Sequence, residues 1–192
     1  MKRAWGKKGC VEEIKVDRRK KNIIELTNCS VGQYREMEKL PVAVLLDNVR
    51  SMHNVGSVLR TCDAFLISEV LLCGITGCPP HPEISKTALG ADESVKWRYE
   101  NNAMDAVIRM KKEGWNICVL EQAHESVPLQ NFIPSGDKKY LLVAGNEVEG
   151  VNQDIVDIAD IILEIPQHGV KHSLNVSVSA GIALWQIVKP FL

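Results

Sequence analysis

The chain has 192 residues, of which 45% are hydrophobic and 24% charged, and a formal net charge of -1 at pH 7. This length suits one domain with a substantial core, and the composition excludes a disordered or fibrous protein. No stretch approaches the ~20 apolar residues that a membrane-spanning helix needs, so we expect no membrane segment.

The N-terminal 39 residues carry much of the positive charge. They hold eleven Lys or Arg against six Asp or Glu, a net charge of +5, which leaves -6 for the remainder. A basic segment is typical of a protein that binds a polyanion, because phosphate contacts supply most of the non-specific affinity for nucleic acid. A solvated arm that only maintains solubility would have the same composition. We divide the chain into a basic extension, residues 1–40, and a body, residues 41–192.

Beyond Pro41, short apolar runs alternate with helical patterns. A strand is predicted at Val42–Leu46, a helix from Asn54 to Leu66, and a second strand at Glu69–Cys73. Because the strands are continuously apolar and alternate with helices, the sequence predicts an α/β fold whose parallel sheet is flanked by helices. The remaining predicted elements are a helix at Asn102–Glu113, strands at Trp115–Leu120, Tyr140–Ala144 and Ile161–Ile165, and a final helix at Ser173–Val188.

The six cysteines, at positions 10, 29, 62, 73, 78 and 118, form no Cys-x-x-Cys pair, and no secretory signal precedes them. This pattern favours free thiols, mostly in the core, in the reducing cytoplasm. A metal site is not indicated either. His168 and His172 are four residues apart, but Gly169 makes a helix unfavourable there and no third ligand is near in sequence.

Three of the segments that follow predicted strands are unusually polar. They read DNVRSMHNVGSVLRT, AGNEVEGV and IPQHGVKHSLNVSVS. Ligands of parallel sheets bind beyond the carboxyl ends of the strands, so these segments are candidates for a binding site. Neither Gly-x-Gly-x-x-Gly nor Gly-Lys-Ser/Thr follows a strand, so neither a standard dinucleotide fold nor a P-loop is supported.

Within the first polar segment, Asn54 is placed to cap the following helix. Gly56 allows a backbone or a ligand to come close to the first turn, and Arg60 lies one and a half turns further on, among apolar neighbours. A helix N-terminus with an arginine is a good phosphate site. A plainly capped helix, with Arg60 paired to a structural carboxylate, explains the same residues.

The other two polar segments offer the same choice between structure and function. Gly145 permits close backbone approach, and Glu147 is an acceptor or an anchor. Ser173 and Asn175 stand where they can cap the last helix and still face a ligand. Capping alone explains each of them singly, but not the three segments together.

The three segments, in this order, resemble the three motifs of the SpoU (TrmH-like) family of RNA 2'-O-ribose methyltransferases, within the SPOUT superfamily. The matching stretches are LLDNVRSMHNVGSVLRTCDAF, LLVAGNEVEGV and EIPQHGVKHSLNVSVSAGIAL. The resemblance runs from about Pro41 to Val188. It implies a SPOUT methyltransferase domain over residues 41–192, with a deep trefoil knot at the C-terminal end and S-adenosyl-L-methionine bound in the knot. It also implies a homodimer whose active site takes residues from both subunits.

Carried over to this sequence, the resemblance implies two groups of site residues. The group implied to be catalytic is Asn54, Arg60, Glu147, Ser173 and Asn175. The group implied to bind the cofactor, largely through backbone atoms and an apolar wall, is Leu120, Gly145, Asn146, Ile165 and Leu174.

The role of Arg60 stays open at this point. The ribose 2'-hydroxyl must lose a proton, yet a free guanidinium has a pKa above ~12 and is a poor acceptor. Either the site perturbs Arg60 strongly, or Arg60 fixes the phosphate and stabilises the alkoxide while water takes the proton.

The resemblance also leaves the RNA open. The basic extension favours a small structured RNA that is recognised through its phosphates and its shape, so we expect tRNA rather than rRNA. The alternatives are rRNA as the substrate, a catalytically silent RNA-binding protein of the same fold, and methylation of a base nitrogen. Gln167, His168, Lys171 and His172 make the last loop more polar than is usual in the family, and we interpret them as contacts to RNA or to the second subunit.

Overall fold

A computed structural model describes residues 18–22, 29–171 and 173–192. His172 and most of the basic extension lie outside these residues. The predictions made for those positions are therefore not addressed by the structure.

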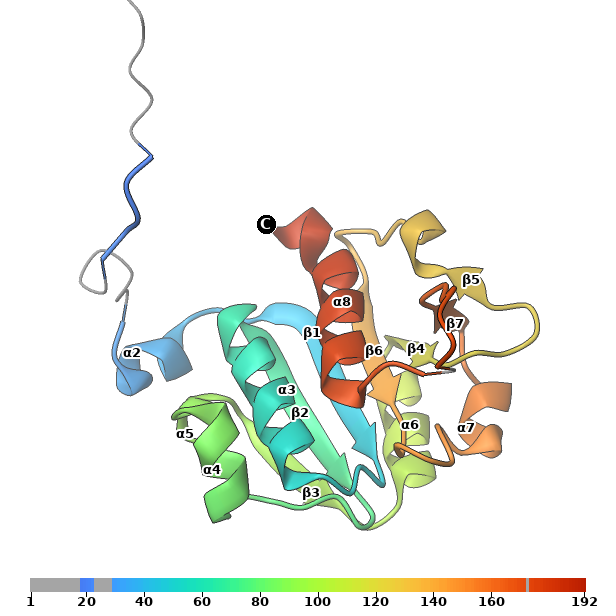
Figure 1. Cartoon of the computed structure of the whole chain (residues 1–192), viewed down its shortest axis with the longest axis horizontal. Helices are drawn as coiled ribbons and strands as arrows, with labels where there is room; N and C mark the ends of the chain where they lie inside the picture. Colours follow the sequence, from blue (N-terminus) through green and yellow to red (C-terminus); the bar gives the residue numbers. More distant parts are fainter. Residues whose placement is uncertain (1–17, 23–28, 172) are drawn as a thin grey trace, which may run out of the picture.

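The body is built on a seven-stranded sheet in the order β3-β2-β1-β6-β4-β7-β5 (Figure 1). All its strand pairs are parallel, which confirms the predicted α/β fold with a parallel sheet. The strands are β1 (Leu40–Asp47), β2 (Ile67–Cys73), β3 (Trp97–Glu100), β4 (Trp115–Leu120), β5 (Val127–Pro128), β6 (Lys139–Ala144) and β7 (Ile161–Glu164).

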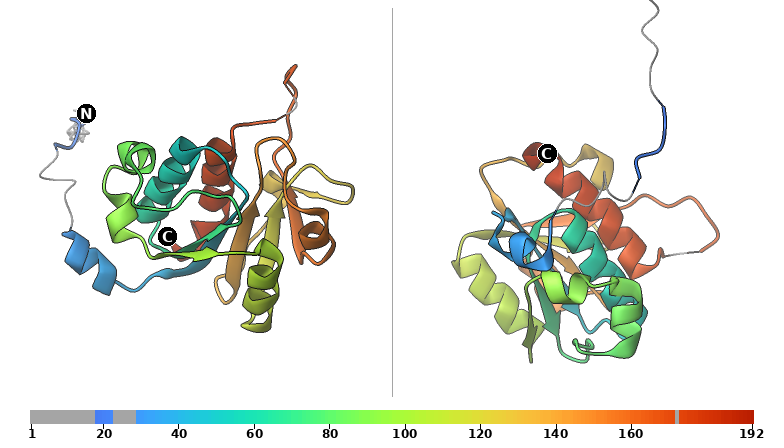
Figure 2. Two further views of the ribbon diagram at one scale, coloured as in Figure 1. Left: turned by 90° about the horizontal axis from the view of Figure 1, so that it is seen from below. Right: turned by 90° about the vertical axis from the view of Figure 1, so that its left-hand side faces the viewer.

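Helices cover both faces of the sheet (Figure 2). In β1, Val42, Val44 and Leu46 pack in the core beneath α3 and α8, whereas Ala43 and Leu45 pack on the other face beneath α6 and α7. The helices are α2 (Val31–Glu36), α3 (Met52–Ala64), α4 (Pro82–Ala88), α5 (Ala91–Ser94), α6 (Ala103–Lys112), α7 (Gln153–Asp157) and α8 (Val176–Val188), with 3-10 turns η1 (Leu129–Asn131) and η2 (Lys189–Phe191).

Two predicted helix starts were wrong. Helix α3 begins at Met52, because the Ser51 hydroxyl accepts from the Asn54 amide at 3.4 Å and caps the helix. Asn54 is therefore inside the first turn. Helix α8 begins at Val176 rather than at Ser173, because Asn175 Oδ1 accepts from the amides of Ser177 and Val178, and Ser173 lies before the cap.

Several short elements were not predicted. Strands β3 and β5 lie at the two edges of the sheet and have partly exposed residues, so they lack the apolar run that marked the inner strands. Helices α4, α5 and α7 have seven residues or fewer, too short for a clear period. Within the described ranges, no helix has the length and apolar character that crossing a membrane requires.

Candidate cofactor pocket and catalytic cluster

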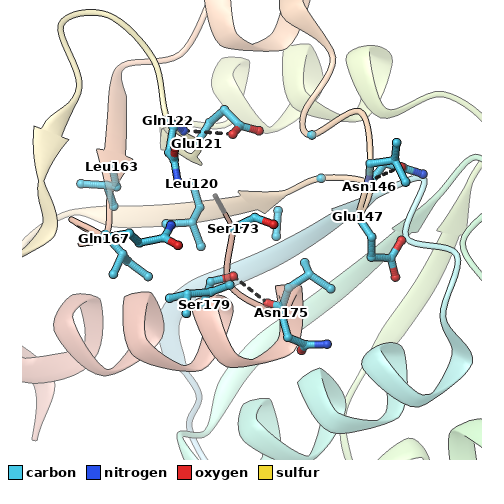
Figure 3. Close-up of a pocket in the computed structure, with 17 residues that line it drawn as sticks. Leu120, Glu121, Gln122, Asn146, Glu147, Leu163, Gln167, Ser173, Asn175 and Ser179 are labelled. Carbon is cyan, nitrogen blue, oxygen red and sulfur yellow. Dashed lines mark hydrogen bonds between the residues drawn. The ribbon is translucent and has the colours of Figure 1, made fainter. Parts of the chain in front are cut away.

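A cavity of about 510 Å³ opens where the loops after β4, β6 and β7 meet the start of α8 (Figure 3). Its position beyond the carboxyl ends of the strands is the one that the sequence indicated. Eight of the ten predicted site residues line it: Leu120, Gly145, Asn146, Glu147, Ile165, Ser173, Leu174 and Asn175.

The loop after β6 is folded back on itself. The backbones of Asn146 and Gly150 exchange two hydrogen bonds of 3.0 Å. A Cβ on Gly145 would lie 2.2 Å from the carbonyl carbon of Gly150 and 2.2 Å from the nitrogen of Val151. The close approach that requires glycine at position 145 is therefore made by the loop's own backbone.

Asn146 holds this loop in place. Its Nδ2 donates to the Asn48 carbonyl at 2.8 Å, and its Oδ1 accepts from the amides of Val148 and Glu149 at 2.8 and 3.2 Å. The side chain is therefore engaged within the protein. Asn146 shapes the pocket wall from the end of β6.

A chain of hydrogen bonds joins the three polar segments. Glu147 accepts from the amides of Arg50 and Ser51 at 3.0 and 3.1 Å, and from Asn54 Nδ2 at 2.9 Å. Asn54 Oδ1 in turn accepts from Asn175 Nδ2 at 3.0 Å. Residues predicted from segments far apart in sequence thus meet at one edge of the cavity.

The environment of Glu147 favours its charged form. Partial burial alone would raise the pKa of this carboxyl, but hydrogen bonds from the Arg50 amide and the Asn54 side chain stabilise the carboxylate. The pKa of Glu147 is consequently below its usual value. The site holds a fixed negative charge at neutral pH.

Arg60 is not part of this cluster. It lies on the exposed side of α3 and lines a separate hollow of about 360 Å³ beside Tyr34 of α2, Asp63 and Ser94. It forms no hydrogen bond or ion pair with another described residue, so no carboxylate within the described part of the chain pairs with it. Apolar side chains, among them Val31, Ala88 and Leu89, share the hollow with Arg60, as its sequence neighbours suggested. One chain alone does not bring Arg60 to Asn54, Glu147 and Asn175.

Sequence reasoning missed several residues of the cavity wall. Glu121, Gln122 and Ser179 line it, as does Gln167, which had been interpreted as an RNA or subunit contact (Figure 3). Glu121 directly follows a predicted strand, so the rule that ligands bind beyond strand ends would have found it. His168 is exposed and does not line the cavity. Among the described residues, no three His, Cys, Asp or Glu side chains are grouped as a metal site would require.

Comparisons with known proteins agree on one family. A sequence model described as the SpoU rRNA Methylase family matches residues 41–185. The tRNA (guanosine(18)-2'-O)-methyltransferase of Aquifex aeolicus is 32% identical over 157 residues, covering 79% of this chain and 70% of the relative. An uncharacterized tRNA/rRNA methyltransferase of Borreliella burgdorferi is 32% identical over 144 residues, covering 75% of this chain and 62% of that protein.

Comparison with solved structures identifies members of the same family. An AdoMet-bound rRNA methyltransferase from Sinorhizobium meliloti superposes with a TM-score of 0.75 at 27% identity, over 83% of this chain and 60% of that one. A TrmH/SpoU tRNA modifying enzyme of A. aeolicus superposes with a TM-score of 0.73 at 29% identity, over 83% of this chain and 81% of that one.

Proposed function

Because this chain belongs to the SpoU rRNA methylase family, we propose that it transfers the methyl group of S-adenosylmethionine to a ribose 2'-hydroxyl of an RNA, with tRNA favoured over rRNA. The observation that carries the proposal is the hydrogen-bonded chain from Glu147 through Asn54 to Asn175 at the edge of the 510 Å³ cavity. The named activity of the A. aeolicus relative supports tRNA.

The cavity fits S-adenosylmethionine by size and chemistry. Its volume lies within the ~300–1,000 Å³ of small-molecule sites, and Leu120, Leu163 and Ile165 give it an apolar wall for an adenine ring. The carboxylates of Glu121 and Glu147 complement a cationic ligand. When bound, the cofactor supplies an electrophilic methyl group on its sulfonium.

We assign the site residues to different tasks. Asn54 and Asn175 orient each other, and together with Ser173 they position the target nucleotide at the cavity mouth. Glu147 holds Asn54 and the start of α3. Arg60 fixes a phosphate and stabilises the developing alkoxide through its permanent charge, with water accepting the proton.

We further propose a homodimer in which Arg60 of one chain completes the pocket of the other. Helix α8 supports this arrangement, because Val178, Ile182 and Trp185 recur on one face and are 51%, 42% and 51% exposed. The ring centroid of Trp185 lies 5.9 Å from that of Phe65, which extends the apolar surface toward the end of α3. Light scattering should give twice the mass of one chain.

The C-terminal segment is proposed to form the trefoil knot of the superfamily. After β7 the chain leaves the sheet, and α8 returns against β6, β1 and η1, with Gln186 donating to the Phe132 carbonyl at 2.6 Å. The end of η1 is thus hydrogen bonded to the last helix. A crystal structure traced through residues 121–192 would test the threading.

The basic extension, residues 1–40, is proposed to contact RNA in the cytoplasm. Lys20 and Lys21 are exposed, and the five described cysteines are free thiols, as a reducing compartment requires. If the extension neutralises phosphates, reversing the charge of both lysines weakens RNA binding and lowers its salt dependence.

The proposed function is tested by incubating the protein with methyl-labelled cofactor and total RNA, then mapping the modified nucleotide. We expect label on a ribose 2'-oxygen of a tRNA, and its loss in an Arg60→Ala variant. Label on rRNA would identify rRNA as the substrate instead. Label on a base nitrogen would show that the protein methylates a base and not a ribose. If the protein binds RNA but transfers no methyl group, it is the catalytically silent RNA-binding protein of the same fold.

A further inference from the structure

Glu121 is a partly buried carboxylate to which the proposed site has so far given only a general electrostatic role. It follows β4 directly, is partly buried, and lines the cavity (Figure 3). Its Oε2 accepts from the Val151 amide at 3.1 Å and its Oε1 accepts from the Gln122 amide at 2.9 Å. The carboxylate is therefore held in a fixed orientation by two backbone donors.

The loop after β6, which we call the glycine loop and which runs from Gly145 to Gly150, packs against this carboxylate. Gly150 has a φ of +72°, and a Cβ at this position would lie 2.2 Å from Glu121 Oε2. A Cβ on Gly145 would in turn lie 2.2 Å from the carbonyl carbon of Gly150. The protein thus brings backbone against the carboxylate on one side, while another side of Glu121 faces the cavity.

The carboxylate retains acceptor capacity toward the cavity. An ionised carboxylate has about four lone-pair sites, and two of those on Glu121 are occupied by backbone donors. The neighbouring wall is apolar, made by Leu120 and Leu163. Asn175 lies on the other side of the cavity (Figure 3), so the reacting end of a ligand points away from Glu121.

We infer that Glu121 accepts hydrogen bonds from the 2'- and 3'-hydroxyls of the ribose of an adenosyl ligand. A carboxylate presents two oxygens side by side, which match a vicinal diol. An acidic residue placed beyond a strand end holds a ribose hydroxyl in the same manner in dinucleotide-binding folds. The inference rests on the proposed function, because it takes S-adenosylmethionine as the ligand, and it makes Glu121 a determinant of cofactor specificity.

The test measures binding by calorimetry with the full chain. The ligands are S-adenosylhomocysteine, 5'-methylthioadenosine, and the 2'-deoxy and 3'-deoxy forms of the latter. The proteins are wild type, Glu121→Gln, Glu121→Asp, and Glu149→Gln as a matched control. Glu149 is an exposed carboxylate in the loop after β6, next to Gly150, and it does not line the cavity. Thermal unfolding without ligand verifies that each variant is folded.

For the wild type, we expect removal of a ribose hydroxyl to weaken binding about 10- to 100-fold, the range for a hydrogen bond to a charged group. Glu121→Gln should weaken binding of 5'-methylthioadenosine by a similar factor and bind the deoxy forms nearly as the wild type does. Glu121→Asp, which shortens the side chain, should behave in the same way. Glu149→Gln should match the wild type with every ligand.

Two results would overturn the inference. If the Glu121 variants lose the same affinity for the ribo and the deoxy ligands, Glu121 only supports the glycine loop. If the Glu121 variants lose affinity for S-adenosylhomocysteine but not for 5'-methylthioadenosine, the carboxylate binds the ammonium group of the amino-acid tail and not the ribose. If the wild type binds none of the adenosyl ligands, the proposed function itself fails.

Discussion

Asn54 is the residue on which the proposed catalytic cluster depends, because its side chain is the link between Glu147 and Asn175. It is 8% exposed, and both ends of its amide are hydrogen bonded, at 2.9 and 3.0 Å. Asn54→Ala should lower the free energy of unfolding by about 1–3 kcal/mol, since buried partners lose their bonds. It should also reduce the methyl-transfer rate at least tenfold while cofactor affinity changes little.

Urea unfolding and single-turnover kinetics measure the two effects. The matched control is Asn116→Ala, which removes only a 3.0 Å bond to the Lys139 carbonyl at the far end of β4. That variant should retain full activity. Wild-type turnover in Asn54→Ala would show that the link between the two residues is not needed for transfer.

The environment of Glu147 predicts how the stability of the fold depends on pH. Its pKa in the folded protein is below the ordinary value of 4.5, so its bonds to Arg50, Ser51 and Asn54 stabilise the fold fully above that value. This stabilisation is lost as the pH falls below 4.5 and through the lowered folded-state pKa. Glu147→Gln should therefore be less stable than the wild type at pH 7, with a difference that shrinks toward pH 3.

Melting temperatures of the two proteins across pH 3 to 7 measure this difference. Because Glu147 is exposed, solvent screening keeps the effect modest. Glu125→Gln, another exposed carboxylate, is the control and should show no such trend. A difference that is constant with pH would mean that the charge of Glu147 contributes nothing to the cluster.

At the scale of elements, the packing of α3 on α4 depends on one glycine. A Cβ at Gly56 would lie 2.1 Å from Thr87 Oγ1 and 2.3 Å from the Ile84 carbonyl oxygen. The sequence allowed either a backbone or a ligand near Gly56, and the structure places the backbone of α4 there. Gly56→Ala should force the helices apart and cost about 1–3 kcal/mol or more.

The control for this substitution is Gly32→Ala in α2, where the nearest atom to the new Cβ would be Ser30 Oγ at 3.9 Å. The melting temperature should fall in Gly56→Ala and stay within a few degrees of the wild type in Gly32→Ala. Equal melting temperatures for all three proteins would mean that α3 and α4 can shift without loss.

The elements also show which features the sequence could predict. Strands β1, β2, β4 and β6 were predictable because burial on both faces requires continuous apolar runs. Strand β7 is mostly half-buried, and it was predictable from its short apolar run alone. The site segments were predictable because parallel strands bring their carboxyl ends together. The sequence identified Asn54 as a site residue but gave it the wrong structural role. Either Ser51 or Asn54 could cap α3, and in the structure Ser51 is the cap. No local pattern distinguishes these two residues.

At the scale of the whole molecule, the position of Arg60 is the feature that a single chain leaves unexplained. The arginine lines a hollow with α2 and α5, whereas Glu147 and Asn175 line the cavity proposed for the cofactor. The periodicity of α3 shows which face of the helix is exposed, but it does not show what covers that face. A second copy of the chain is the partner that the apolar face of α8 favours.

This arrangement predicts that two inactive variants restore activity when they share a dimer. Arg60→Ala and Asn175→Ala should each be inactive alone, but a mixed dimer keeps one site with both residues intact. Random pairing then gives about a quarter of the wild-type activity. The control mixes Glu147→Ala with Asn175→Ala, which damage the same pocket, and should restore nothing. If purified mixed dimers of the first pair stay inactive, Arg60 does not act across the interface.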